Sequence, residues 1–276
     1  MKDINGFIKR FEAGLTALEG VSWPEARRRY DTACQQFAPP DPAGLGVRDE
    51  SVANVAVRRF SPFDAAAAGA VLYVHGGGFT IGSVRSHHGI AASLAEALGH
   101  EVMSVAYRLA PDATYADMLA DCHAVAGAIT PITAMVGDSA GGRLVMDLAK
   151  RLYAKIPLGL IYPPVEGLCE DTLGRDAPLL SRADVLSLQP YYPETRPAPL
   201  GSPPPSFALE VLAVEHDPLT VPLEAAVAHW RNAGADIGYR CAPGMVHGAL
   251  HAHALLPNMQ NAWQDFCQAL ASRITR

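Results

Sequence analysis

Apolar residues near the amino terminus recur every three or four positions, which predicts a helix with one apolar face. They are Ile4, Phe7, Ile8, Phe11, Leu15 and Leu18. A second helix is expected over residues 26–37, because Pro24 suits a first helical turn and Pro39 and Pro40 follow the pattern. We expect the apolar face to pack on its own domain rather than on a partner or a membrane.

Short apolar runs further along the chain predict β-strands, and helical patterns separate most of them. The strands are expected at 52–60, 70–74, 101–107, 133–136, 158–162, 208–214 and 237–241. The helices are expected at 86–98, 115–129, 140–153, 222–233 and 255–274. Strands that alternate with helices of ten or more residues indicate an α/β fold, with a parallel sheet covered on both faces.

Residues 165–206 interrupt this alternation. Seven prolines lie between Pro190 and Pro205, and no strand pattern is present there. A long irregular segment in a compact domain is usually functional or disordered, so we expect an excursion from the core. The chain then divides into N-terminal helices (1–45), a core (46–164 and 207–276) and the excursion (165–206).

Composition narrows the functional classes. The chain has 276 residues, 49 % of them apolar, which suits one large domain, and its net charge of −6 leaves no basic stripe for nucleic acid. No apolar run is long enough to span a membrane, and charged residues near the amino terminus argue against a signal peptide. Five widely spaced cysteines predict reduced thiols in a cytoplasmic protein.

The stretch Gly137-Asp138-Ser139-Ala140-Gly141-Gly142 lies between a predicted strand and a predicted helix. A strand that turns sharply into a helix exposes its middle residue at the helix amino end, and small residues on both sides avoid a steric clash. Ser139 is therefore a candidate nucleophile. An idle serine in a glycine-rich turn is the alternative interpretation.

Three consecutive glycines, Gly76 to Gly78, directly follow the strand predicted at 70–74. Backbone amides in such a loop can stabilise the oxyanion that forms during acyl transfer. We predict that the amides of Gly77, Gly78 and Ala140 serve this purpose, although a flexible loop has the same composition. His75 is expected to anchor the loop through a hydrogen bond.

The acid and the base should follow the serine in that order. Asp217 lies just beyond the strand predicted at 208–214, with Glu215 as its competitor, and His247 follows the last predicted strand. His251 and His253 are rivals for the base, and their spacing also suggests a metal ligand pair. Because the sequence places no third ligand, we predict no metal and no cofactor.

These segments together resemble the hormone-sensitive-lipase family of α/β-hydrolases, in the branch of bacterial carboxylesterases with a Gly-Asp-Ser-Ala-Gly elbow. The motifs are residues 73–79, 107–112, 137–142, 215–219 and 244–248. The resemblance covers residues 52–270. It implies an eight-stranded, mostly parallel sheet with a small helical cap, built from the N-terminal helices and the excursion.

Residue by residue, the resemblance implies Ser139 as nucleophile, Asp217 as acid and His247 as base. The implied function is a carboxylesterase for small, short-acyl esters, without cofactor or nucleic-acid partner, and with a possible homodimer. An amide, formamide, carbamate or lactone hydrolase with the same triad is the alternative. A non-catalytic small-molecule receptor, as among the plant gibberellin receptors, is a remote one, since such proteins lose the histidine that is present here as His247.

Overall fold

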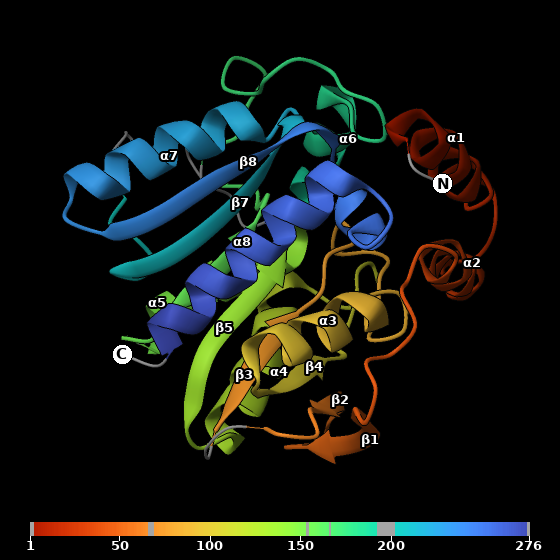
Figure 1. Ribbon diagram of the computed structural model, residues 1–276. Helices are drawn as coiled ribbons and strands as arrows, with labels where there is room; N and C mark the ends of the chain where they lie inside the picture. The colour runs from red at the N-terminus through yellow and green to blue at the C-terminus, as the bar shows by residue number, and fades with distance from the viewer. Residues whose placement is uncertain (1–2, 66–68, 153–154, 166, 192–201, 275–276) are drawn as a thin grey trace.

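Eight strands form one sheet through the middle of the protein, whose computed structural model describes residues 3–65, 69–152, 155–165, 167–191 and 202–274 (Figure 1). In chain order they are β1 Gly46–Val52, β2 Val55–Ser61, β3 Ala70–Val74, β4 Glu101–Val105, β5 Ile132–Asp138, β6 Leu158–Ile161, β7 Ala208–His216 and β8 Asp236–Val246. Their order across the sheet is β1-β2-β4-β3-β5-β6-β7-β8. β1 and β2 pair antiparallel, as do β2 and β4, whereas the pairs from β4 through to β8 are parallel. The predicted fold class is confirmed.

Helices cover both faces of this sheet. The α-helices are α1 Ile4–Thr16, α2 Trp23–Gln35, α3 His88–Leu98, α4 Tyr115–Ala128, α5 Ala140–Leu152, α6 Arg182–Ser187, α7 Thr220–Asn232 and α8 Pro257–Ile274. Two short 3₁₀ turns are η1 Gln189–Tyr191 and η2 Ala249–Ala252. Buried side chains of α3 and α8 pack on one face, and those of α4, α5 and α7 pack on the other.

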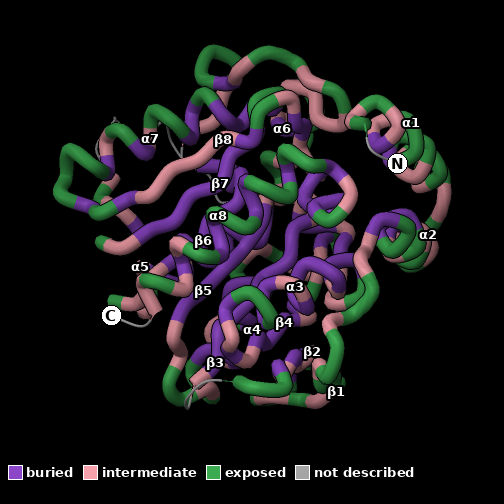
Figure 2. The backbone as a smooth tube through the Cα atoms, in the orientation of Figure 1, coloured by how far each residue is buried: buried purple, intermediate pink, exposed green. Residues whose placement is uncertain are grey.

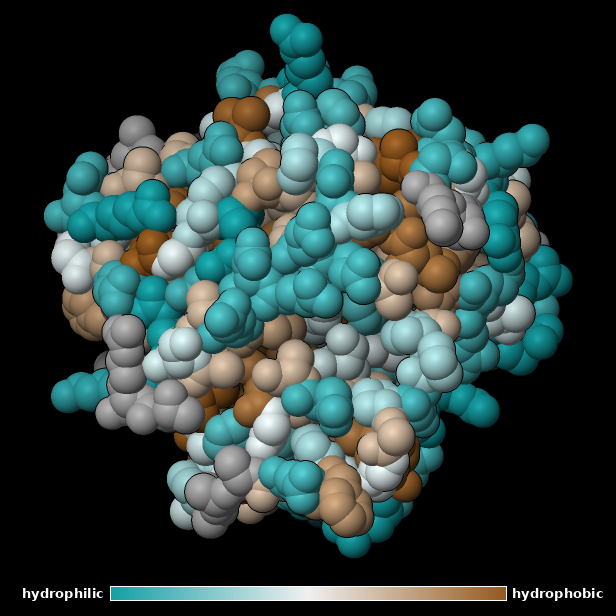
Figure 3. Space-filling view, in the orientation of Figure 1, coloured by the Kyte–Doolittle hydropathy of each residue, from teal (hydrophilic) through white to brown (hydrophobic). Residues whose placement is uncertain are grey.

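The central strands of the sheet are buried on both faces, and most of their residues are purple in Figure 2. All five residues of β3 are buried, which explains why its sequence is apolar throughout rather than alternating. The side of the molecule seen in Figure 3 is mostly hydrophilic, with small separate hydrophobic areas. Within the described residues, none of the helices combines the length and the apolar character that crossing a bilayer requires.

The structure corrects the predicted first strand. A hairpin of β1 and β2 replaces the single strand expected over 52–60, because Ala53 and Asn54 both take positive φ values, 50° and 65°, and turn the chain. β1 has no apolar pattern because most of its residues are exposed at the sheet edge. This exposure removes the signal on which the prediction of strands depends.

Other differences concern the ends of elements. β8 runs to Val246, five residues further than predicted, and the excursion contains the helix α6, which the sequence analysis did not predict. A capping box between Ser181 and Asp184 begins α6. The last residue of the helix expected at 140–153 and most of the proline-rich stretch, residues 192–201, lie outside the described residues.

Candidate active site

Ser139 stands at the turn between β5 and α5, with a φ of 49°, in the left-handed region that side chains disfavour. The neighbouring glycines make this turn sterically possible. A Cβ at Gly137 would collide with the backbone of Gly141, and one at Gly141 would collide with the carbonyl oxygen of Val74. The tight elbow therefore needs glycine at both positions, and it leaves the serine half-buried at the carboxyl end of the sheet.

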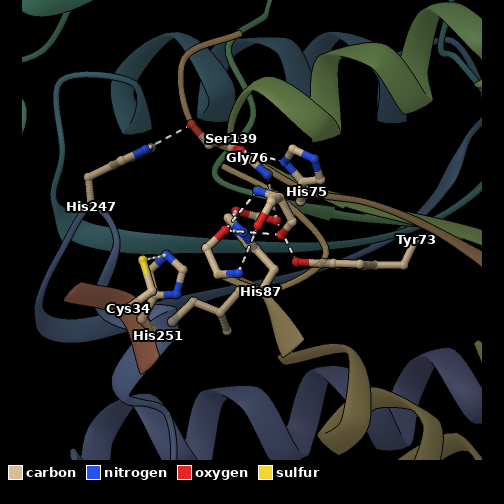
Figure 4. Close-up of polar contacts among 12 residues, drawn as sticks. Cys34, Tyr73, His75, Gly76, His87, Ser139, His247 and His251 are labelled. Atoms are coloured by element: carbon tan, nitrogen blue, oxygen red, sulfur yellow. Dashed lines mark hydrogen bonds and ion pairs between the residues drawn. The ribbon is translucent and has the colours of Figure 1, made fainter. Parts of the chain in front are cut away.

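The structure brings Ser139, His247 and Asp217 into one hydrogen-bonded row. Ser139 Oγ lies 2.9 Å from His247 Nε2, a contact drawn in Figure 4, and His247 Nδ1 lies 2.6 Å from Asp217 Oδ2. Asp217 is buried just after β7, and its other oxygen accepts a hydrogen bond from the Leu219 amide at 2.8 Å. Because the carboxylate can only accept, the imidazole carries its proton on Nδ1, and Nε2 accepts from the serine hydroxyl.

The loop after β3 lies beside the serine. Gly77 and Gly78 have positive φ values of 116° and 58°, and with Ala140 they line the cavity in front of Ser139. Their three backbone amides make no hydrogen bond to any described residue. The carbonyl of Gly77, in contrast, accepts from the amides of Thr80 and Ile81, at 3.2 and 3.0 Å, which closes the loop into a fixed turn.

The rival acid and bases lie elsewhere. Glu215 Oε2 accepts a hydrogen bond from the Gly244 amide, so it supports the turn before His247 instead of contacting the imidazole. His251 Nε2 faces Tyr30, and His253 Nδ1 contacts the carbonyl oxygen of Leu250. Neither histidine reaches Ser139. No cluster of three or more potential metal ligands is present among the described residues.

Asp138 is a functional candidate that the sequence analysis missed. Its buried carboxylate accepts hydrogen bonds from the Tyr73 hydroxyl, at 2.6 Å, and from the Gly76 amide, at 3.1 Å; His87 Nε2 lies 3.3 Å away (Figure 4). Burial opposes ionisation, but His87 and Tyr73 outweigh it and hold the Asp138 pKa well below its ordinary value. The ionised carboxylate thus fastens the glycine loop after β3 to the turn that carries Ser139. A buried aspartate needs such partners, so the position of Asp138 at the end of the apolar strand β5 was the signal available in the sequence.

His75 lies behind the same loop. Its Nδ1 is 2.8 Å from the Gly76 carbonyl oxygen, and its ring stacks on Tyr107 with centroids 4.4 Å apart. The Tyr107 hydroxyl in turn donates to the His75 carbonyl oxygen at 2.8 Å. Burial lowers the His75 pKa to about 3, so the ring is neutral and supports the loop by packing and hydrogen bonding.

Arg27 of α2 connects the N-terminal helices to the loop. Its guanidinium donates to the Thr80 carbonyl at 3.0 Å and to the Ala110 carbonyl at 2.8 Å, and it pairs with Asp112 at 2.9 Å. One turn further along α2, Asp31 accepts from the Ser83 hydroxyl at 2.6 Å. One face of α2 therefore holds the segment that contains Gly77 and Gly78, a role the sequence pattern did not indicate.

The row of Ser139, His247 and Asp217 opens into a cavity of about 750 Å³. Residues of α1, α2 and η2 form one wall, including Phe11, Leu15, Tyr30 and His251. The other wall comes mainly from the excursion and is chiefly aliphatic, with the exposed polar residues Ser187 and Gln189 beside Leu168, Leu179, Leu180, Val185, Leu186 and Leu188. No lysine or arginine is among the described residues that line this space.

Residues 71–251 match the family model described as alpha/beta hydrolase fold. The turn around Ser139, the glycine loop after β3 and the order of the site residues agree with this match. The chain belongs to the alpha/beta-hydrolase family. Ethyl acetate hydrolase of Pseudomonas putida is 27 % identical across 99 % of this chain and 98 % of its own length. Human hormone-sensitive lipase is 33 % identical over 108 residues, 34 % of this chain and 10 % of that protein.

A solved structure adds to these findings. The chain superimposes on an esterase from the bacterial hormone-sensitive lipase family with a TM-score of 0.80, at 24 % identity, over 98 % of both chains. This superposition shows the shared fold, and the family-model match together with the curated relatives confirms the predicted resemblance. Several other curated relatives match over less than half of their own length.

Proposed function

We propose that this α/β-hydrolase is a serine carboxylesterase that hydrolyses small, short-acyl esters through an acyl-enzyme. The observation that carries the proposal is the continuous row from Ser139 through His247 to Asp217, placed beside three backbone amides that make no hydrogen bond to a described residue. Acyl transfer needs a nucleophile, a base, a group that orients the base, and donors for the oxyanion. The nucleophile, the base and the donors line one cavity, and Asp217 contacts the base at 2.6 Å.

The proposed reaction begins when Ser139 Oγ attacks the ester carbonyl carbon and passes its proton to His247 Nε2. Asp217 holds the ring through Nδ1 and stabilises the imidazolium that forms. The amides of Gly77, Gly78 and Ala140 stabilise the tetrahedral oxyanion. As the intermediate collapses, the bond to the alcohol breaks and His247 protonates the departing oxygen. Water then attacks the acyl-enzyme by the same steps, which releases the acid and restores the serine.

Two observations support a small substrate. The cavity of about 750 Å³ lies in the size range of small-molecule sites, and its wall is mainly aliphatic. The full-length relative named for ethyl acetate hydrolysis supports the same class. In this proposal α1, α2 and the excursion together act as the cap that encloses the substrate.

Hydrolysis of p-nitrophenyl esters from acetate to palmitate, by the wild type and by Ser139→Ala, tests the function. We expect the wild type to cleave the shortest esters and the variant to lose about 10⁶ in turnover. Activity on amides, carbamates or lactones in place of esters would reassign the substrate class while keeping the site. A wild type that neither cleaves any ester nor labels with an acylating reagent would favour a receptor.

Two finer statements remain predictions, namely a cytoplasmic location and a homodimer. Cell fractionation tests the first. Light scattering of the purified protein tests the second, with a mass of twice 29.3 kDa expected for a dimer.

A further inference from the structure

The two walls of the cavity differ in polarity. The excursion contributes mainly aliphatic side chains, and its polar lining residues Ser187 and Gln189 are exposed, whereas the wall of α1, α2 and η2 adds two buried, uncharged polar groups, the Tyr30 hydroxyl and the His251 imidazole. Both side chains are buried, with exposed fractions of 6 % and 5 %. Polar atoms in a buried, otherwise apolar wall are costly unless they have partners.

One nitrogen of His251 has partners. Its Nε2 lies 3.3 Å from the Tyr30 hydroxyl and 3.6 Å from Cys34 Sγ, while Phe11 stacks on the ring at 5.6 Å between centroids (Figure 4 labels Cys34 and His251). The other nitrogen, Nδ1, makes no hydrogen bond within the described part of the chain.

Solvent contact distinguishes this Nδ1 from a sealed polar atom. The described residues do not enclose this Nδ1 completely, so the atom retains some accessible surface. His251 lines the cavity, and we infer that this surface of Nδ1 faces the substrate space. His253, two residues on, provides a contrast, since its Nδ1 is bonded to the Leu250 carbonyl oxygen at 2.9 Å.

The charge of the site selects a neutral group. Burial lowers the pKa of His251 well below its ordinary value, so the ring is uncharged near neutral pH. No lysine or arginine lines the described cavity, and the ionised Asp138 does, so a substrate carboxylate is disfavoured. A hydroxyl group both donates and accepts, and therefore pairs with Nδ1 in either tautomer of the imidazole.

We propose that His251 Nδ1 binds a hydroxyl group of the substrate, so that the preferred substrates are short esters bearing a hydroxyl. Phe11 and Leu15 pack on the carbon skeleton beside it. Tyr30 holds the imidazole in place through Nε2. This inference rests on the proposed esterase function and names the substrate class of the same site.

Isosteric substrate pairs test the proposal, because a methyl and a hydroxyl group have similar size. Ethyl 3-hydroxybutanoate is compared with ethyl 3-methylbutanoate, and 2-hydroxyethyl butanoate with propyl butanoate, by titration of the released acid. The first pair probes the acyl side and the second the alcohol side. We expect about a tenfold preference in kcat/KM for the hydroxylated member of at least one pair, as a neutral hydrogen bond provides.

Two replacements of His251 separate its nitrogens. An asparagine amide ends near the position of Nδ1, and a glutamine amide ends near that of Nε2. His251→Asn should keep most of the preference, whereas His251→Gln should reduce it to within about twofold of unity. The preference is a ratio within one preparation, so a smaller folded fraction cancels. Tyr30→Phe, expected to lower the ratio to about threefold, serves if either variant fails to fold.

Tyr239→Phe is the matched control. Its hydroxyl donates to Glu224 at 2.7 Å, away from the cavity lining, and the ratio should stay about tenfold. Equal cleavage of both members in every pair, or an undiminished preference in His251→Gln and Tyr30→Phe, would overturn the hydroxyl site alone. A wild type that cleaves none of the esters would overturn the esterase proposal and this inference with it.

Discussion

The two walls of the cavity are attached to the core in different ways. The wall formed by α1, α2 and η2, here called the N-terminal wall, is held by directional polar contacts. Arg27 binds the Thr80 and Ala110 carbonyls, and Asp31 binds the Ser83 hydroxyl. Among the described residues, the side-chain hydrogen bonds of Arg182, Asp184 and Ser187 in α6 stay within residues 170–187, and the excursion is tied to the core by a backbone bond from the Gly174 amide to the Pro218 carbonyl at 2.8 Å. That wall meets the site through aliphatic side chains, chiefly leucines.

This difference suggests a division of roles. Directional bonds fix the position of a loop to fractions of an ångström, which matters for donors that must meet a transition state. Aliphatic contacts are non-directional, so they constrain volume rather than orientation. We infer that the N-terminal wall preserves catalytic geometry. The wall formed mainly by the excursion, here called the α6 wall, limits the length of the substrate.

Replacement of Arg27 should have the largest effect. In Arg27→Ala the buried carbonyls of Thr80 and Ala110 lose their donor, and the oxyanion loop loses its external support. We expect kcat to fall by about 10–100-fold while KM changes less than about threefold, because oxyanion donors act in the transition state. Steady-state kinetics on a short ester measures both parameters.

Arg28→Ala is the control for that variant. Arg28 is one residue along α2 and pairs only with Glu25 among the described residues, so its loss should leave kcat unchanged. A rise in KM alone in Arg27→Ala would show that the N-terminal wall binds substrate without positioning the oxyanion donors.

The neutral His75 beneath the oxyanion loop predicts an acid limit to stability. Its pKa is about 3 in the folded state and near 6.5 when unfolded, so between these values only the unfolded chain binds the proton. The contribution of His75 to the free energy of unfolding is therefore fully present above pH 6.5. It is lost as pH falls, by up to about 1.4 kcal/mol per pH unit. Urea unfolding at pH 7, 6 and 5 measures the slope.

His75→Asn provides the comparison for that slope. An amide does not titrate, so the variant should lose free energy of unfolding less steeply between pH 6.5 and 5. Parallel slopes in the two proteins would mean that other groups cause the acid sensitivity.

A shortened leucine on the α6 wall should have the smallest effect. A Cβ at Gly78 would lie 3.3 Å from the Leu188 methyl carbons, so this side chain closes the cavity above the oxyanion loop. Leu188→Ala should raise kcat/KM for hexanoate and octanoate esters by about fivefold, because the removed methyl groups leave room for extra methylenes. The acyl-chain profile of p-nitrophenyl esters measures this change.

Leu18→Ala is the matched control, since Leu18 packs at the N-terminal end of the core and does not line the described cavity. Its profile should match that of the wild type. A Leu188→Ala profile that keeps the wild-type optimum would place the length limit elsewhere.

Features that depend on local chemistry were predictable from the sequence. The elbow around Ser139 needs glycines at fixed offsets, and the order of Asp217 and His247 follows from the order of the strands. The alternation of helices and strands predicted a parallel sheet covered by helices on both faces, because this pattern too is read from neighbouring residues. These signals are contained in short stretches of chain.

Features that depend on distant partners were not predictable. Arg27 meets Thr80 across 53 positions, and Tyr73 meets Asp138 across 65, without any periodic pattern that links them. β1 escaped because an exposed edge strand has no buried face, and α6 because it is only six residues long. The polarity of the His251 wall likewise arises only when α1, α2 and η2 meet.

The central claim is that Ser139 is the nucleophile that His247 activates, and covalent trapping tests it most directly. The protein is incubated with a p-nitrophenyl phosphonate, and intact and peptide masses are recorded for the wild type, Ser139→Ala and His247→Ala. We expect one adduct per chain on the Ser139 peptide, none in Ser139→Ala, and formation slower by about 10³-fold or more in His247→Ala. An adduct on another residue, or equal labelling in Ser139→Ala, would contradict the account.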